Sequence, residues 1–204
     1  MQKSKGITNA KGITGCRFSL SVMSDNYAAM ILDAIGRVNT RHVWCATDAL
    51  STVYRGTRPH VVEGVRAVFT AVNDGKTHIT LDATFSSGCP NDQAADYVGT
   101  DTTPVMGDYG ASFPVIGKIA FYPLGAADYM EHISAVAQMA EAFHVNMKAS
   151  HYATELAGDV NNIFAYFNHV LAYAEENITH YVLHAMLSVN SPGLKRSESH
   201  VELI

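Results

Sequence analysis

A row of small polar residues in one stretch of the chain suggests a binding surface. The stretch HITLDATFSSGCP, residues 78–90, alternates apolar and polar residues as a half-buried strand does. Thr80, Asp82 and Thr84 then share one face of the strand. A carboxylate among apolar neighbours is costly to bury without a donor, so Asp82 either meets a donor at a binding site or forms an ion pair with Arg17 or Arg55. The sequence leaves both interpretations open.

Three other groups are candidates for chemistry. Glu155 lies among small residues in HYATELAGD, which leaves room for a flat ring, although a solvated edge residue fits the pattern equally well. His180 and His184 lie in a predicted strand, where four residues span about 13 Å, too far for both to hold one metal ion. Cys89 precedes a proline and has no evident base nearby, which favours a role in a turn over one as a nucleophile.

Recognisable catalytic signatures are absent from the sequence. It contains no GxSxG, no P-loop, no GxGxxG and no HExxH motif. We therefore expect a protein that is not an enzyme, with no catalytic residues, no metal and no cofactor.

Composition narrows the class of protein further. The 204 residues are 48% hydrophobic and 16% charged, which is enough for a sizeable core. A formal charge of −5 opposes nucleic-acid binding, because phosphates require a basic surface. The three scattered cysteines favour a reducing cytoplasm. No secretory signal and no apolar run near 20 residues is present, so we expect a soluble cytoplasmic protein without membrane insertion.

The chain repeats itself at an offset of 180 − 78 = 102 residues. The first stretch recurs as HYVLHAMLSVNSP, from residue 180, and Gly56 falls on Gly158. Thr57 falls on Asp159, and both are good N-caps before an apolar-periodic segment. Units of a hundred residues indicate a duplicated domain and not a solenoid.

Each half has the same predicted order of elements. In the first half a strand over 16–23 precedes a helix capped by Ser24, two strands over 42–47 and 50–55 follow, and a helix from Thr57 leads to the strand after His78. The order predicts an α+β protein of tandem duplicated ferredoxin-like βαββαβ repeats, each an antiparallel four-stranded sheet with helices on one face.

The predicted boundaries follow from the repeat. They are a flexible N-terminal tail over 1–14, a first repeat over 15–90, a linker over 91–114, a second repeat over 115–193 and a C-terminal tail over 194–204.

The helix-free side of each predicted sheet needs an explanation. Ser19 of the first strand lies beside the polar row of the first half, and the second half places Tyr122 and His184 on the same side. A partly apolar sheet face is rarely left bare. We expect another sheet to cover it, either from the sister half or from a second subunit.

Several blocks together resemble the YkoF family of thiamine- and hydroxymethylpyrimidine (HMP)-binding proteins. They are GCRFSLSVMSDNY, VWCATDALSTVYRGT, HITLDATFSSGCPND, DYMEHI, HYATELAGDVNNIF and LSVNSPG, spread over about residues 15–193. The resemblance implies tandem ferredoxin-like repeats, a homodimer, one ligand site per repeat and a role in thiamine or HMP salvage or uptake. It also implies a functional link to a thiamine or HMP transporter and no enzymatic activity.

An aminopyrimidine is a flat ring that needs a carboxylate or carbonyl, one or two hydroxyls and an apolar surface. The candidate ligand-binding residues are Ser19, Ser51, Thr80, Asp82 and Thr84 in the first repeat, and Tyr122, Glu155 and His184 in the second. Two alternatives remain: a small α+β enzyme acting on a pyrimidine-type metabolite, and a ligand-sensing regulatory module.

Overall fold

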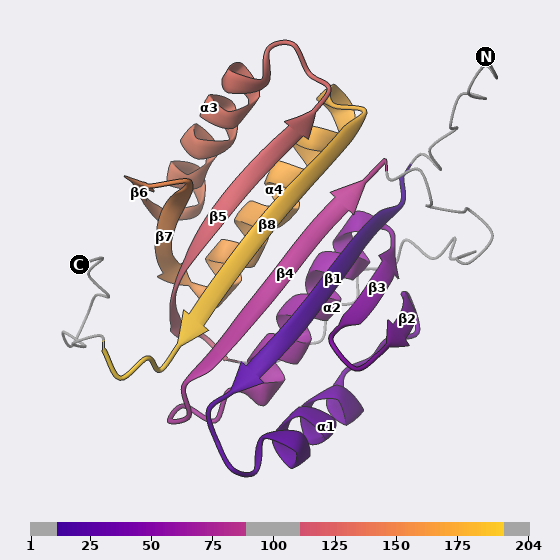
Figure 1. Ribbon diagram of the computed structural model, residues 1–204, viewed down its shortest axis with the longest axis vertical. Helices are drawn as coiled ribbons and strands as arrows, with labels where there is room; N and C mark the ends of the chain where they lie inside the picture. The colour runs from indigo at the N-terminus through magenta and orange to yellow at the C-terminus, as the bar shows by residue number, and fades with distance from the viewer. Residues whose placement is uncertain (1–11, 89–110, 194–204) are drawn as a thin grey trace.

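A single eight-stranded antiparallel sheet organises the computed structural model, which describes residues 12–88 and 111–193 (Figure 1). The first repeat comprises β1 (Thr14–Val22), α1 (Tyr27–Arg37), β2 (Trp44–Thr47), β3 (Thr52–Gly56), α2 (Arg58–Val72) and β4 (Ile79–Ser87). The second comprises β5 (Pro114–Leu124), α3 (Tyr129–Met139), a 3₁₀ turn (Ala140–Phe143), β6 (Asn146–Ser150), β7 (Ala153–Asp159), α4 (Val160–Asn177) and β8 (His180–Val189). The predicted α+β tandem of ferredoxin-like repeats is confirmed. Most of the predicted N-terminal tail, most of the predicted linker and the whole predicted C-terminal tail lie outside the described residues.

The two repeats join edge to edge. The strand order is β2-β3-β1-β4-β8-β5-β7-β6, and β4 pairs with β8 over its whole length, with Ala83 opposite Ala185. The expectation that the sister half covers the helix-free side is therefore wrong. Each of these strands ends a four-stranded unit and would leave its backbone N–H and C=O groups unpaired, and pairing them with each other satisfies those groups. Alternating residues are compatible with stacked sheets and with side-by-side pairing alike, so the sequence pattern did not distinguish them.

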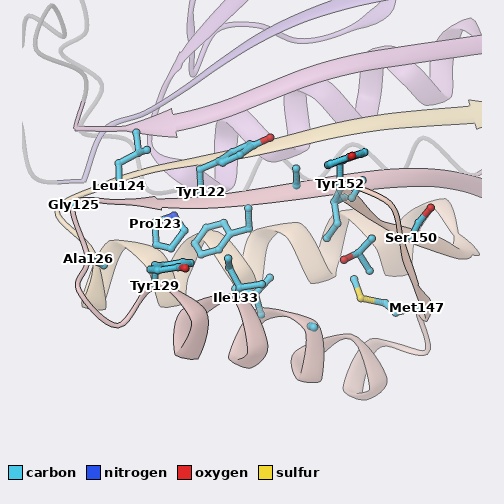
Figure 2. A pocket seen from close by; sticks show the side chains of 17 residues that line it. Tyr122, Pro123, Leu124, Gly125, Ala126, Tyr129, Ile133, Met147, Ser150 and Tyr152 are labelled. Carbon is cyan, nitrogen blue, oxygen red and sulfur yellow. The ribbon is translucent and has the colours of Figure 1, made fainter.

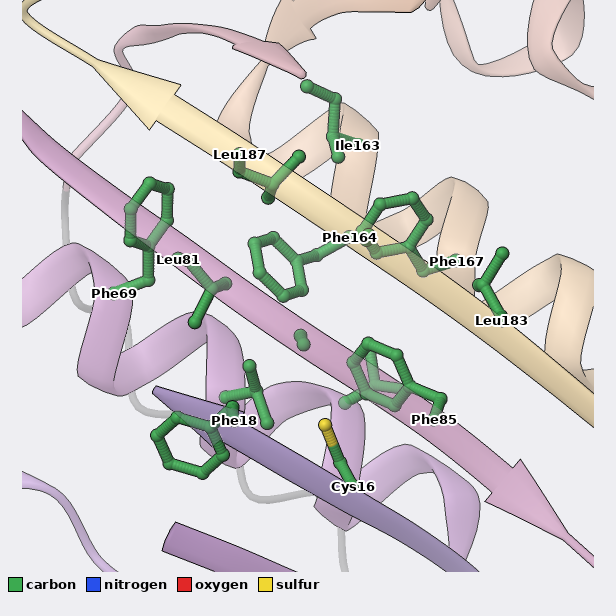
Figure 3. Packing of buried hydrophobic residues seen from close by; sticks show 14 of the residues in the cluster. Cys16, Phe18, Phe69, Leu81, Phe85, Ile163, Phe164, Phe167, Leu183 and Leu187 are labelled. Atoms are coloured by element: carbon green, nitrogen blue, oxygen red, sulfur yellow. The ribbon is translucent and has the colours of Figure 1, made fainter. Parts of the chain in front are cut away.

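The helices all lie on one side of the sheet and cover a core that both repeats share (Figures 1 and 3). Residues of β4 alternate between buried and half-buried, because every second side chain points to the helices. Phe85 of β4 contacts Phe167 of α4, with ring centroids 6.2 Å apart, and Phe69 of α2 lies 6.5 Å from Phe164. The boundary between the repeats is thus filled by aromatic side chains and is not a hinge.

Helix starts follow the predicted capping residues in two cases out of three. Asp159 caps α4, and its side chain accepts a hydrogen bond from the Asn161 N–H at 2.8 Å. Thr57 is the N-cap of α2. The prediction that Ser24 caps α1 is wrong, since the N-cap is Asn26. The Ser24 hydroxyl instead accepts from the Asn26 N–H at 3.2 Å, so it closes the turn that precedes the helix.

The outer helices are held less firmly than the central ones. Helix α1 buries only Ala34, and α3 buries only His132 and Val136, whereas α2 and α4 bury most of their apolar residues. Helices α1 and α3 lie toward the two ends of the sheet, where its outer strands are short (Figure 1). The weak burial of α3 leaves space between this helix and the sheet.

Candidate functional site

A cavity of about 630 Å³ lies between β5, α3 and the hairpin that joins β6 to β7 (Figure 2). Cavities of about 300–1,000 Å³ are typical of sites that bind small organic molecules.

The cavity forms because β7 is shorter than β5. Strand β7 begins at Ala153 and pairs with β5 only as far as Ile119, whereas β5 continues to Leu124. Helix α3 passes over the part of β5 that has lost its neighbour, and the turn between β6 and β7 closes one end. The strand lengths, and not an unusual motif, therefore create the space.

Aromatic and apolar side chains dominate the lining. Tyr129 and Ile133 come from α3 and Tyr152 from the hairpin turn, while Tyr122 lies at the rim, on the side of β5 that points away from the helices (Figure 2). Tyr152 has a positive φ of 63°, a conformation that the tight turn imposes. Tyr122 and Tyr129 are 48% and 52% exposed, so both have ring surface left for a ligand. Such walls suit a flat, largely apolar ring.

Hydroxyl groups supply the polarity of the lining, together with a nearby carboxylate. Ser150 lines the cavity and donates a hydrogen bond of 3.0 Å to Glu155 Oε1, which also lies 3.4 Å from Lys118 Nζ. The bond from Ser150, supported by Lys118, lowers the pKa of Glu155. Glu155 is therefore ionised at neutral pH and fixes the Ser150 hydroxyl at the edge of the cavity.

A second polar cluster lies on the helix-free side of the sheet, here called the open face. His184 Nε2 and Asp82 Oδ1 are 3.3 Å apart, and the side chains are 35% and 45% exposed. Ser19 lies opposite Asp82 in the sheet, and Thr84 lies opposite His184. Asp82 thus has a partner from the other repeat, which neither sequence interpretation of this residue included.

The structure separates the predicted site residues into three groups. Tyr122 lines the cavity, and Glu155 touches it through Ser150. Ser51 lies in the turn before β3, where its N–H donates to Asp48 Oδ1 at 2.8 Å. The remaining five share the open face, outside the cavity lining: Ser19, Thr80, Asp82, Thr84 and His184. That any of these eight residues contacts a ligand stays a prediction.

Sequence reasoning missed most of the cavity walls. Tyr129 belongs to no motif that marks it as a site residue, and the place of Tyr152 beside the cavity depends on the length of β7. The available signal is a tyrosine that occurs at the same place in both repeats, as Tyr27 and Tyr129. Tyr27 is 56% exposed, so it is not retained as a core residue. Tyr27 on α1 and Leu50 before β3 occupy the corresponding places in the first repeat.

The described part of the chain shows neither a metal-binding cluster nor a membrane-spanning helix. Residues 12–88 and 111–193 contain no group of three or more His, Cys, Asp or Glu side chains arranged to hold a metal ion. Within the same residues no helix has the length and hydrophobicity to cross a membrane.

Comparison with known proteins assigns the chain to a family. The fold is an α+β tandem of ferredoxin-like repeats, with a cavity beside β5 in the second repeat. Residues 13–92 and 115–194 each match the family described as "YKOF-related Family", and the chain belongs to this family. The chain is similar to "Putative HMP/thiamine-binding protein YkoF" of Bacillus subtilis (strain 168), with 34% identity over 192 residues, covering 93% of this chain and 96% of that protein.

Proposed function

We propose that the protein binds thiamine or its HMP moiety without catalysis, and that the ring occupies the cavity between β5 and α3. The observation that carries the proposal is the cavity itself, with its tyrosine walls and the fixed Ser150 hydroxyl. Family membership and the printed name of the Bacillus relative supply the ligand class.

The cavity suits an aminopyrimidine better than a highly charged metabolite. Its lining residues are aromatic, apolar or hydroxylated, and the nearest charged side chain described above is the carboxylate of Glu155. A ring of this size gains about 5–8 kcal/mol, which corresponds to micromolar to sub-millimolar affinity. Such affinity suits a cytoplasmic carrier in salvage or uptake, supplied by a transporter.

Calorimetric titration with HMP, thiamine and oxythiamine tests the ligand class. We expect heat with the first two and weaker binding of oxythiamine, which lacks the amino group. A stoichiometry of two per chain supports one site in each repeat, and a stoichiometry of one restricts binding to one of them. Absence of heat with HMP and with thiamine contradicts the proposal. Recovery of a chemically altered ligand, seen by mass spectrometry, would favour the enzymatic alternative.

A matched pair of variants on α3 tests the location of the site. Ala137 lines the cavity on an exposed part of the helix, so Ala137→Phe fills the space without disturbing the core. Ser134 is exposed on the same helix and outside the lining, so Ser134→Phe is the control. We expect Ala137→Phe to weaken binding in the second repeat by tenfold or more, and Ser134→Phe to leave it unchanged. Equal affinity in both variants places the ligand elsewhere.

We also propose that the open face pairs with the open face of a second copy. Met186 at its centre is 51% exposed, and the charged groups beside it are already paired within the chain, as Asp82 with His184 and Lys118 with Glu155. An exposed apolar residue among polar groups that already have partners suits a sheet-on-sheet contact between identical surfaces.

Mass determination in solution tests this pairing. The wild-type chain is expected to be a dimer, and Met186→Lys a monomer at the same concentration. Met130→Lys is the control, because Met130 is similarly exposed, at 56%, but lies on α3. A monomeric wild-type chain, or equal masses for all three proteins, contradicts the pairing.

A further inference from the structure

Helix α3 turns one histidine toward the interior of the protein. His132 is 8% exposed and, together with Val136, is one of the two buried residues of α3. Its Nδ1 lies 2.8 Å from the Tyr173 hydroxyl on α4, and its Nε2 lies 3.3 Å from Asp128 Oδ1. The rings of His132 and Tyr173 also meet edge to face, with centroids 5.8 Å apart. His132 thus connects α3 to α4 by a hydrogen bond as well as by packing.

The two partners determine which ring nitrogen carries the hydrogen in the neutral histidine. A carboxylate attracts an N–H and repels a nitrogen lone pair, so Asp128 favours a hydrogen on Nε2. Nδ1 is then an acceptor, and the Tyr173 hydroxyl donates to it. Asp128 is also the N-cap residue of α3, but among the described residues its side chain makes no capping hydrogen bond. Its carboxylate therefore orients the ring, and the bond from Tyr173 holds the helix.

A second tyrosine of α4 holds the other half of α3. The Tyr166 hydroxyl donates to the Val136 carbonyl at 3.0 Å, inside the core. Val136 is one turn closer than His132 to the C-terminal end of α3, so the two bonds divide the helix between them. Tyr129 and Ile133, which line the cavity, lie in the half that His132 holds (Figure 2). The distance of these two walls from β5 therefore depends on the histidine contact.

We propose that His132 is a positioning residue for the binding site of the second repeat. By accepting from Tyr173, His132 fixes the first half of α3 over the cavity at the separation from β5 that a flat ring requires. A helix that is already held in place has less freedom to lose when a ligand binds, which raises the affinity. The inference rests on the proposed function, and it adds the residue that sets the width of the site.

The first repeat replaces this contact by apolar residues. At the offset of 102 residues, Met30 stands in the place of His132 and Ala71 in the place of Tyr173. Met30 is half-buried and packs against the core. Helix α1 is tied to α2 from its last turn, where Arg37 donates to the Ala71 carbonyl at 2.6 Å. Since packing by Met30 holds the first half of α1, changes at the histidine contact are expected to affect the second repeat only.

Two substitutions of His132 separate the hydrogen bond from the packing. His132→Asn keeps an oxygen near the position of Nδ1 that accepts from Tyr173, but it leaves part of the ring volume empty. His132→Leu fills the volume and offers no acceptor. We expect His132→Asn to bind thiamine within about twofold of the wild type in the second repeat, and His132→Leu to bind it about threefold to tenfold more weakly. Calorimetric titration measures the affinities, and circular dichroism measures the melting temperatures.

Two further variants complete the experiment. Tyr173→Phe removes the hydroxyl and keeps the ring, and it is expected to weaken binding as His132→Leu does. In the Ala137→Phe background the remaining heat belongs to the first repeat, and we expect every change at His132 and Tyr173 to leave that heat unaltered.

Each outcome bears on the inference. If the affinities follow the melting temperatures, with His132→Leu at least as tight as His132→Asn, the inference is wrong and the proposed function stands, because His132 then acts only through stability. If the wild-type chain binds neither thiamine nor HMP, the proposed function fails and this inference fails with it.

The nitrogen resonances of the ring give a second measurement, on the wild-type chain. In ¹⁵N-histidine spectra at a pH where the ring is neutral, we expect the hydrogen of His132 on Nε2 and the downfield signal of an acceptor nitrogen at Nδ1. His132→Asn removes this signal and so assigns it, and Tyr173→Phe is expected to shift it. A hydrogen on Nδ1 overturns the inference, because the Tyr173 hydroxyl then does not donate to the ring.

Discussion

Gly117, where β5 pairs with β8, is a position at which the sheet does not tolerate a larger side chain. Gly117 lies opposite Leu187, and a Cβ at this position would collide with the Met186 carbonyl oxygen and lie 2.7 Å from Leu187 Cδ2. Backbone cannot move aside as a flexible side chain does. The same close approach is absent at Gly15 in β1, where a Cβ would lie 3.9 Å from the nearest atom, the Ser86 carbonyl oxygen.

The Gly117→Ala variant is therefore expected to lose about 1–3 kcal/mol of unfolding free energy through overpacking. Gly15→Ala, the matched control in β1, is expected to be neutral or slightly stabilising. Urea denaturation of both variants measures the difference. Equal stability of the two variants would show that the sheet relaxes around the added methyl group.

The carboxylate of Glu155 makes the stability of the β6–β7 hairpin depend on pH. Its pKa is lower in the folded protein than in the unfolded chain, because Ser150 donates to it and Lys118 lies near. The resulting stabilisation is fully present above the unfolded pKa of about 4.3 and is lost as the pH falls through the folded pKa. Thermal unfolding of the wild type and of Glu155→Gln is expected to differ most at neutral pH and to converge in acid. A difference that stays constant from pH 7 to pH 3 contradicts this account.

At the scale of elements, the sequence predicted what depends on local pattern. The repeat identified both copies of each strand and helix, and the alternation around Asp82 placed it with Thr80 and Thr84 on the helix-free side. The join of β4 to β8 was not predictable, because alternation describes the faces of a strand and not its edges. The cavity was missed for a related reason: it depends on where β7 stops relative to β5, a difference of a few residues in strand length.

The hairpin from β6 to β7 and helix α3 are the elements that determine whether the cavity exists. Both are weakly held, since β6 is an edge strand and α3 buries only two residues. A ligand that contacts both is expected to stiffen them. Binding sites are commonly assembled from such low-stability elements, next to a rigid scaffold of central strands.

At the scale of the whole molecule, the shared sheet and core make one cooperative unit of two repeats. Arg58 of α2 donates to Glu175 of α4 at 2.9 Å, and Glu175 also accepts from Thr14 of β1 at 3.0 Å. At the other end of this boundary, Asn190 donates to the Thr77 carbonyl at 3.0 Å. Polar contacts thus bridge the boundary at both ends of its aromatic centre.

The position of the single tryptophan allows a test of this cooperativity. Trp44 lies in β2 of the first repeat, and Phe167 lies in α4 of the second. Phe167→Ala is expected to cost about 3–5 kcal/mol and to shift the unfolding transition seen by Trp44 fluorescence as much as that seen by circular dichroism. A fluorescence midpoint that stays in place while the circular dichroism midpoint moves would mean that the repeats unfold independently.

The central claim is that the space between β5 and α3 holds the aromatic ring of the ligand. A crystal of the protein grown with HMP tests it most directly. The account predicts ring density between Tyr129 of α3 and strand β5. A ring bound on the open face beside Asp82 and His184, with this cavity empty, would contradict it.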